Sequence, residues 1–96
     1  SLLELRNFLQ KQKSIYLATP RGWPTKGYIS SRYGWRIHPI TGLKEFHPGV
    51  DICAPLGSPV RTTASGIVVY TGKTRYNGNF VIIEHGYGYR TFYAHL

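Results

Sequence analysis

Glycine and proline divide the chain into two parts of different character. Neither residue occurs in residues 1–17, whereas all 11 Gly and 6 Pro lie from Pro20 onward. In the first part, Leu2, Leu5 and Leu9 recur at helical spacing, which predicts an amphipathic helix. We identify no N-terminal capping residue, so we expect this helix to be the tail of a longer helical region.

The rest of the chain alternates short apolar runs with turn residues, which is the pattern of an antiparallel all-β domain. The expected strands are Tyr28–Ser31, Val50–Ala54, Val60–Thr63, Gly66–Thr71, Phe80–Glu84 and Tyr89–His95. Residues 86–88, Gly-Tyr-Gly, are expected to form the hairpin loop between the last two strands. A hydrophobic content of 42% with 17% charged residues suits a small folded domain. We therefore predict an all-β, antiparallel domain preceded by an N-terminal α-helix.

The chain carries 12 Lys and Arg residues against 4 Asp and Glu residues, a formal net charge of +8. Such a charge attracts polyanions, and nucleic acid and an anionic cell-envelope polymer fit it equally well. The basic residues are scattered, without a run of five like charges. A small basic β-domain that binds nucleic acid in a salt-dependent way therefore stays as one alternative. No apolar stretch approaches membrane-spanning length.

The pentapeptide from His47 to Asp51 is the most informative local motif. It places an imidazole and a carboxylate four residues apart across a Pro-Gly-Val link. Positions four apart face the same side of an extended chain. Both groups are zinc ligands. We expect a loop imidazole and a strand carboxylate to converge on one point, with a surface hydrogen bond as the alternative.

The other histidines have different surroundings. We expect a surface or supporting role for His38, which lies in a loop, and a structural hydrogen-bonding role for His85 at a strand end. His95 follows Tyr93 on the last expected strand. Strand alternation would place both side chains on one face, with His95 opposite Asn79. A histidine in such a strand is more often packed than catalytic.

Five segments follow one another in the second part of the chain. They are Ser31–Pro39, His47–Val60, Ala64–Val68, Asn77–Gly86 and Tyr93–Leu96. In this order and spacing they resemble the lysostaphin-type (LytM-like) zinc metallopeptidases, over about residues 21–96. The resemblance implies a helix and linker in residues 1–20. It also implies that residues 21–96 are the N-terminal portion of a lysostaphin-like domain of the duplicated-hybrid or barrel-sandwich type, truncated at its C-terminus.

The resemblance also implies a site for a zinc ion, Zn²⁺. The family's first motif carries two metal ligands, which correspond to His47 and Asp51. His95 corresponds to a catalytic histidine that does not bind the metal but helps to activate water or to stabilise the tetrahedral intermediate. The family's third ligand is the second His of a downstream His-x-His motif, which this chain does not contain.

The implied function is zinc-dependent endopeptidase cleavage of the peptide cross-links of bacterial peptidoglycan, outside the cytoplasm, in the periplasm or cell envelope. With two of three ligands, we expect the chain by itself to be an incomplete, inactive fragment. The alternative within the family is a non-catalytic LytM-like module that binds or activates cell-wall amidases. We also expect that the helix or an open sheet edge permits self-association. Neither a nucleic-acid partner nor a membrane span is expected.

Overall fold

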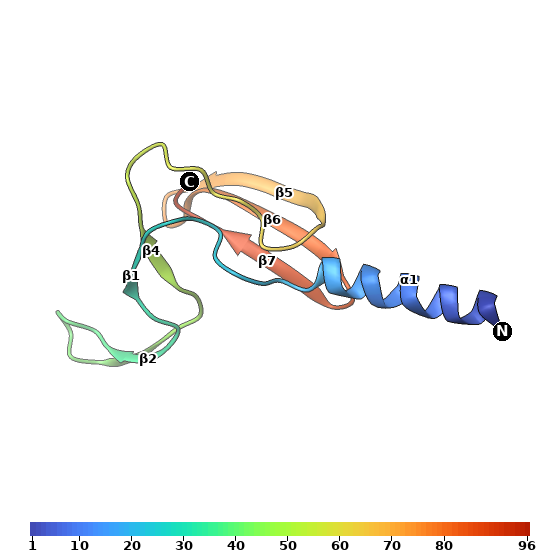
Figure 1. The fold of residues 1–96 in the computed structure, drawn as a ribbon. Helices are drawn as coiled ribbons and strands as arrows, with labels where there is room; N and C mark the ends of the chain where they lie inside the picture. The colour runs from blue at the N-terminus through green and yellow to red at the C-terminus, as the bar shows by residue number, and fades with distance from the viewer. The chain divides into compact units, whose positions relative to one another are not determined.

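The computed structural model describes residues 1–96 and contains one helix and seven strands (Figure 1). The elements are α1 (Leu2–Ala18), β1 (Tyr28–Ser31), β2 (Gly34–Ile37), β3 (Lys44–His47), β4 (Asp51–Cys53), β5 (Ile67–Thr74), β6 (Gly78–Gly86) and β7 (Tyr89–Tyr93). All strand pairs are antiparallel. The predicted all-β class with one N-terminal helix is confirmed.

Helix α1 matches its predicted range but carries a cap that we did not expect. The hydroxyl of Ser1 accepts a hydrogen bond from the Glu4 main-chain N–H at 3.3 Å. The Glu4 carboxylate accepts one from the Ser1 amino group at 3.2 Å. These reciprocal bonds form a capping box, so the predicted absence of an N-terminal cap is wrong. No helix in the structure has the length and hydropathy that crossing a membrane requires.

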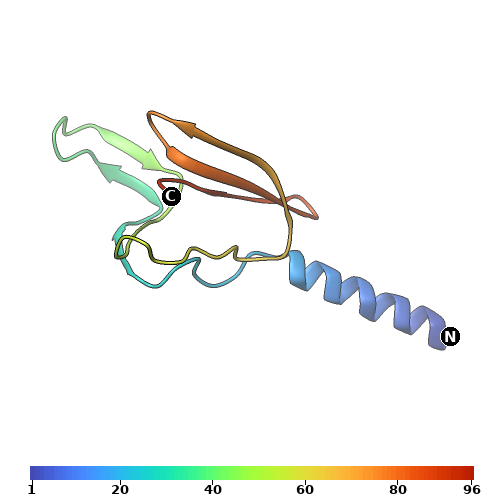
Figure 2. The ribbon, with the colours of Figure 1, turned by 90° about the horizontal axis from the view of Figure 1, so that it is seen from above.

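The chain forms two compact units, the first made of Ser1–Trp23 and Thr62–Leu96 and the second of Pro24–Arg61. The first unit contains a three-stranded sheet in the order β5-β6-β7, drawn as the orange to red ribbons of Figure 2. Tyr87 and Gly88 join β6 to β7 with positive φ angles of 53° and 81°. Two consecutive positive φ angles suit the right-handed twist of a hairpin, and they confirm the predicted loop.

The central strand β6 supplies the buried residues of this sheet. Phe80 and Ile83 are each 8% exposed. The ring of Phe80 lies 5.6 Å from that of Tyr70 on β5 and 5.4 Å from that of Phe92 on β7. One aromatic row therefore crosses all three strands and holds them together.

His85 is buried in the same unit, with 7% of its surface exposed. Its Nδ1 lies 2.8 Å from the main-chain oxygen of Ser65, and its Nε2 lies 2.7 Å from the hydroxyl of Thr91. Both ring nitrogens are thus satisfied within the fold, as a buried imidazole requires. The predicted structural role of His85 is confirmed.

The second unit contains two strand pairs, β1 with β4 and β2 with β3. The β2–β3 hairpin was not among the predicted strands, because Pro39 and Gly42 read as loop residues. Its connecting loop is closed by a bond from His38 N–H to the Leu43 oxygen at 2.8 Å. The His38 ring adds to this closure, since its Nδ1 accepts bonds from Ile40 and the next residue at 3.2 Å.

The predicted strand Val60–Thr63 is wrong, since these residues belong to no strand. Their backbone donors have other partners. In the second unit, Arg61 N–H donates to the Pro24 oxygen at 2.7 Å. In the first, Thr63 N–H donates to the Tyr93 hydroxyl at 3.0 Å. Donors engaged in this way cannot form a strand ladder.

Candidate metal centre

His47 and Asp51 stand at the facing ends of two strands in the second unit. His47 is the last residue of β3 and Asp51 is the first residue of β4. The Nε2 atom of His47 lies 3.5 Å from Oδ1 of Asp51. The predicted convergence is confirmed, although the imidazole belongs to a strand and not to a loop. The imidazole is 14% exposed and the carboxylate is 56% exposed, so the pair is open to solvent on the carboxylate side.

The other ring nitrogen of His47 is held by the backbone. Its Nδ1 lies 2.9 Å from the main-chain oxygen of Arg32, with the Ser31 hydroxyl further away at 3.5 Å. A carbonyl oxygen only accepts, so Nδ1 carries the hydrogen of this bond. In the neutral ring, Nε2 then presents a free lone pair toward Asp51.

This arrangement fits a metal ion between the two side chains. Two lone-pair donors 3.5 Å apart repel each other unless a cation or a proton lies between them. In a tetrahedral zinc site, one nitrogen and one oxygen ligand are separated by about 3.3–3.5 Å, given zinc–ligand bonds of 2.0–2.2 Å. A charge-assisted hydrogen bond from a protonated imidazole would be shorter, about 2.7–2.9 Å. Histidine ligands also commonly donate their second N–H to a carbonyl, as His47 does to Arg32.

The pair has no third protein ligand. The structure contains no group of three or more His, Cys, Asp or Glu side chains placed to hold one metal ion. Two side chains are fewer than the three protein ligands of a catalytic zinc site or the four of a structural one.

His95 belongs to the first unit and lies beyond the end of β7. Its φ angle is 58°, and its N–H donates to the Asn77 oxygen at 2.8 Å. The predicted pairing of His95 with Asn79 is wrong, because it is Leu96 whose N–H bonds Asn79, at 3.0 Å. The left-handed backbone at His95 interrupts the strand alternation on which that prediction relied.

The backbone of His95 is strained, and its side chain is exposed. A left-handed residue other than glycine costs on the order of 1–3 kcal/mol, and such residues cluster at functional sites. Gly78, which sequence reasoning missed, borders this residue. A Cβ at position 78 would lie 3.5 Å from Cα of His95 and 3.6 Å from its Nδ1.

Sequence reasoning also missed the hydrogen bonds of Tyr93. Its hydroxyl accepts the N–H of Thr63 at 3.0 Å and lies 3.1 Å from the Thr63 hydroxyl. Burial raises the pKa of Tyr93, but hydrogen bonds from Thr63 and Thr91 outweigh burial, and its pKa lies below the ordinary value. Tyr93 thereby ties the loop before β5 to the strand that leads to His95.

Comparison with protein families identifies the family to which the chain belongs. The family model described as peptidase family M23 matches residues 45–96, which is more than half of the chain. The chain belongs to peptidase family M23. The matched range contains His47, Asp51 and His95.

Curated relatives of this M23 chain come from several bacteria. It is 46% identical over 68 residues to the DD-carboxypeptidase/endopeptidase Mpg of Neisseria meningitidis, a match covering 71% of the chain and 16% of the relative. It is 44% identical over 73 residues to the peptidoglycan DD-endopeptidase ShyA of Vibrio cholerae, a match covering 75% of the chain and 17% of the relative. It is 37% identical over 75 residues to the cell division protein DipM of Caulobacter vibrioides, a match covering 77% of the chain and 12% of the relative.

The chain thus spans about one sixth of the length of Mpg and ShyA. No solved structure matches it.

Proposed function

We propose that the protein carrying this chain is a zinc-dependent endopeptidase that hydrolyses peptide cross-links of bacterial peptidoglycan outside the cytoplasm. Residues 1–20 would be a helix and linker, and residues 21–96 part of the peptidase domain. His47 and Asp51 are the proposed zinc ligands, and His95 is the proposed catalytic histidine. Mpg and ShyA, whose names describe endopeptidases, support this proposal.

The observation that carries the proposal is the orientation of His47. Its Nε2 faces the Asp51 carboxylate at 3.5 Å while its Nδ1 is fixed on the Arg32 oxygen at 2.9 Å. A histidine in a surface ion pair needs only one of these contacts. A histidine ligand uses both, because the second contact fixes the tautomer that leaves Nε2 free for the metal.

Each residue has a separate task in this proposal. Zinc with an open coordination position lowers the pKa of bound water to about 7 and polarises a carbonyl group. His47 and Asp51 supply one neutral and one anionic ligand. The exposed imidazole of His95 can accept a proton or donate a hydrogen bond to a developing oxyanion, which contributes about 10²–10⁴-fold.

A non-catalytic module that recruits or activates cell-wall amidases is the second candidate. The absence of a third ligand beside the pair is the observation in its favour. The oriented His47–Asp51 pair favours the enzyme, since a module without metal has no need of two converging ligands.

The test uses the full-length protein and three variants, His47→Ala, Asp51→Ala and His95→Ala. We expect the first two to lose both bound zinc, measured by mass spectrometry, and the release of soluble fragments from purified cell walls. His95→Ala should lose fragment release while keeping zinc.

Loss of zinc in His95→Ala would contradict the role proposed for His95. A wild-type protein that binds no zinc yet stimulates a purified amidase would replace the enzyme with the second candidate. The 96-residue chain alone, with two ligands, should release far fewer fragments than the full-length protein.

A further inference from the structure

The β2–β3 hairpin has two faces of different chemistry. Its register pairs Gly34 with His47, Trp35 with Phe46, Arg36 with Glu45, and Ile37 with Lys44. Side chains alternate between the faces of a strand pair. The face that carries His47 therefore also carries the Arg36–Glu45 ion pair, whose atoms are 3.1 Å apart. The opposite face carries Trp35, Ile37, Lys44 and Phe46.

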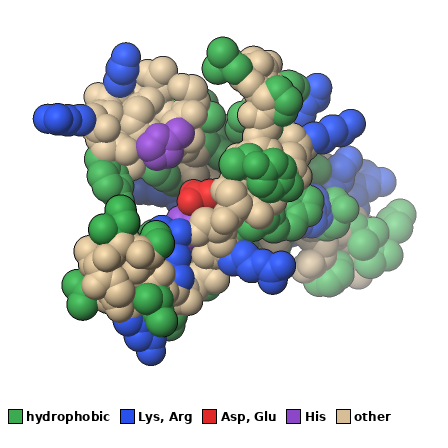
Figure 3. All heavy atoms as spheres, turned by 90° about the vertical axis from the view of Figure 1, so that its left-hand side faces the viewer, with side chains coloured by type: hydrophobic (Ala, Val, Ile, Leu, Met, Phe, Trp, Pro, Cys, Tyr) green, Lys and Arg blue, Asp and Glu red, His purple; other side chains and the backbone are tan.

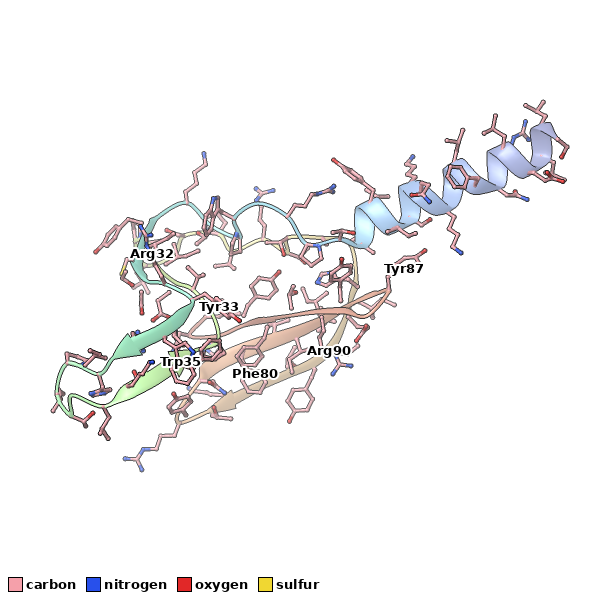
Figure 4. The ribbon with its side chains drawn as sticks, turned by 90° about the horizontal axis from the view of Figure 1, so that it is seen from below. Arg32, Tyr33, Trp35, Phe80, Tyr87 and Arg90 are labelled. Carbon is pink, nitrogen blue, oxygen red and sulfur yellow. The ribbon has the colours of Figure 1, made fainter.

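This opposite face is an exposed aromatic surface. Trp35 is 67% exposed and Phe46 is 43% exposed, and the adjacent Tyr33 is 64% exposed. We call these three residues the aromatic platform; Tyr33 and Trp35 are labelled beside the hairpin in Figure 4. Hydrophobic side chains reach the surface elsewhere too (Figure 3), but here three aromatic rings meet.

The rings are ordered by their contacts with each other. Phe46 lies 5.1 Å from Tyr33 and 5.4 Å from Trp35 between ring centroids, at angles of 82° and 63°. In an edge-to-face pair the edge of one ring meets the face of the other, so each contact covers part of one ring face, while Trp35 keeps 67% of its surface exposed. The ammonium group of Lys44 lies 5.3 Å from the Trp35 centroid, which is cation–π distance. The platform thus combines exposed aromatic surface with an adjacent positive charge.

We propose that the aromatic platform binds the glycan strand of peptidoglycan. Sugar rings present flat C–H faces of slight positive charge, which match the negative faces of aromatic rings. Lys44 suits the carboxylates of the peptides attached to this glycan, and the chain's net charge of +8 favours the same anionic polymer. The choice of this glycan rests on the proposed function.

The location of the platform gives it a role apart from cleavage. Because it lies on the hairpin face opposite to His47, a bound sugar strand would not compete with the metal for its ligands. Glycan binding there would hold the cell wall beside the protein while a cross-link is cut. The platform is therefore a docking surface and not part of the reacting centre.

The test measures binding of the full-length protein to purified peptidoglycan and to soluble N-acetylglucosamine oligosaccharides, which carry no peptide. Trp35→Leu keeps an apolar side chain against Phe46 but removes the ring face. We expect it to weaken both interactions by about 10-fold or more, as for an aromatic anchor that becomes buried when its ligand binds. Trp35→Tyr should restore most of the binding. Tyr76→Leu, at a residue that is 87% exposed on the β5–β6 turn, is the matched control and should bind like wild type.

Equal binding by wild type and Trp35→Leu, with unchanged melting temperature, would overturn the proposal. Binding of peptidoglycan without binding of the sugar-only oligosaccharides would overturn it as well, and would identify the peptides as ligand. Should Trp35→Leu unfold, Lys44→Gln tests the same face and should weaken peptidoglycan binding. If wild type cuts no cross-link but binds the oligosaccharides through Trp35, the proposed function fails while the platform stands.

Discussion

The Nδ1 atom of His47, the last residue of β3, lies 2.9 Å from the main-chain oxygen of Arg32, which precedes β2 by two positions. Gly34, two positions after Arg32, is the ladder partner of His47. The hairpin therefore determines the orientation of the proposed ligand, because its register decides where the Arg32 oxygen lies.

Gly34→Val should weaken zinc binding by the full-length protein without touching a ligand. Gly34 has a φ of 118°, which a β-branched residue adopts only under strain. Relief of that strain would move the hairpin and the Arg32 oxygen. Loss of such a supporting contact costs about 10–100-fold in metal affinity. Competition with a chromogenic chelator measures the affinity, and wild-type affinity in Gly34→Val would contradict this account.

Zinc should raise the melting temperature of the wild-type protein, because a ligand that binds only the folded state stabilises that state. The stabilisation is about 2.7 kcal/mol when the free ligand concentration is 100 times the dissociation constant. Asp51→Asn keeps the size of the side chain but removes the anionic ligand, so the zinc-dependent shift should shrink. Differential scanning fluorimetry with and without a chelator provides the measurement. An equal shift in both proteins would exclude Asp51 as a ligand.

Tyr93→Phe should destabilise the first unit. It leaves the ring in place but removes the acceptor of the Thr63 N–H, which lies 3.0 Å from the hydroxyl. A part-buried donor without a partner costs about 1–3 kcal/mol. Tyr76→Phe, on an exposed turn, is the matched control and should change the free energy of unfolding little. Equal urea midpoints for the two variants would argue against the role of the Tyr93 hydroxyl.

Gly66→Ala should disturb the approach of β5 to β6. A Cβ at this position would lie 2.6 Å from the Glu84 main-chain oxygen and 2.7 Å from Cγ2 of Ile83. Neither atom can yield easily, because one is backbone and the other belongs to a buried residue. The overpacking should cost about 1–3 kcal/mol of unfolding free energy. Gly49→Ala, whose Cβ would meet nothing within 4 Å, should be close to neutral in the same assay.

The Glu84–Arg90 pair should make stability depend on pH in the acidic range. The hydrogen bond from Arg90, at 2.8 Å, lowers the pKa of Glu84 below its ordinary value of 4.5. Because the pKa of Glu84 is lower in the folded protein, the contribution of the pair to stability is complete above pH 4.5. This contribution is lost as the pH falls through the pKa that Glu84 has in the folded protein. Arg90→Gln should flatten this part of the melting-temperature profile. An unchanged profile would show that the exposed pair contributes nothing measurable.

The sequence by itself determined the features that depend on neighbours along the chain. The spacing of Leu2, Leu5 and Leu9 predicted α1, and the Gly-Tyr-Gly segment predicted the β6–β7 turn. The four-residue spacing of His47 and Asp51 predicted their convergence. The assignment of these two residues to zinc, and of His95 to catalysis, remains a prediction.

Only the tertiary structure decided the features whose partners are distant in sequence. The β2–β3 hairpin forms in spite of Pro39 and Gly42, because its ladder lies outside the loop that contains them. Thr63 is kept out of a strand by the Tyr93 hydroxyl, and His95 turns left-handed where its N–H reaches Asn77. Residue patterns report local preference, whereas a main-chain donor takes whichever acceptor the folded chain brings within reach.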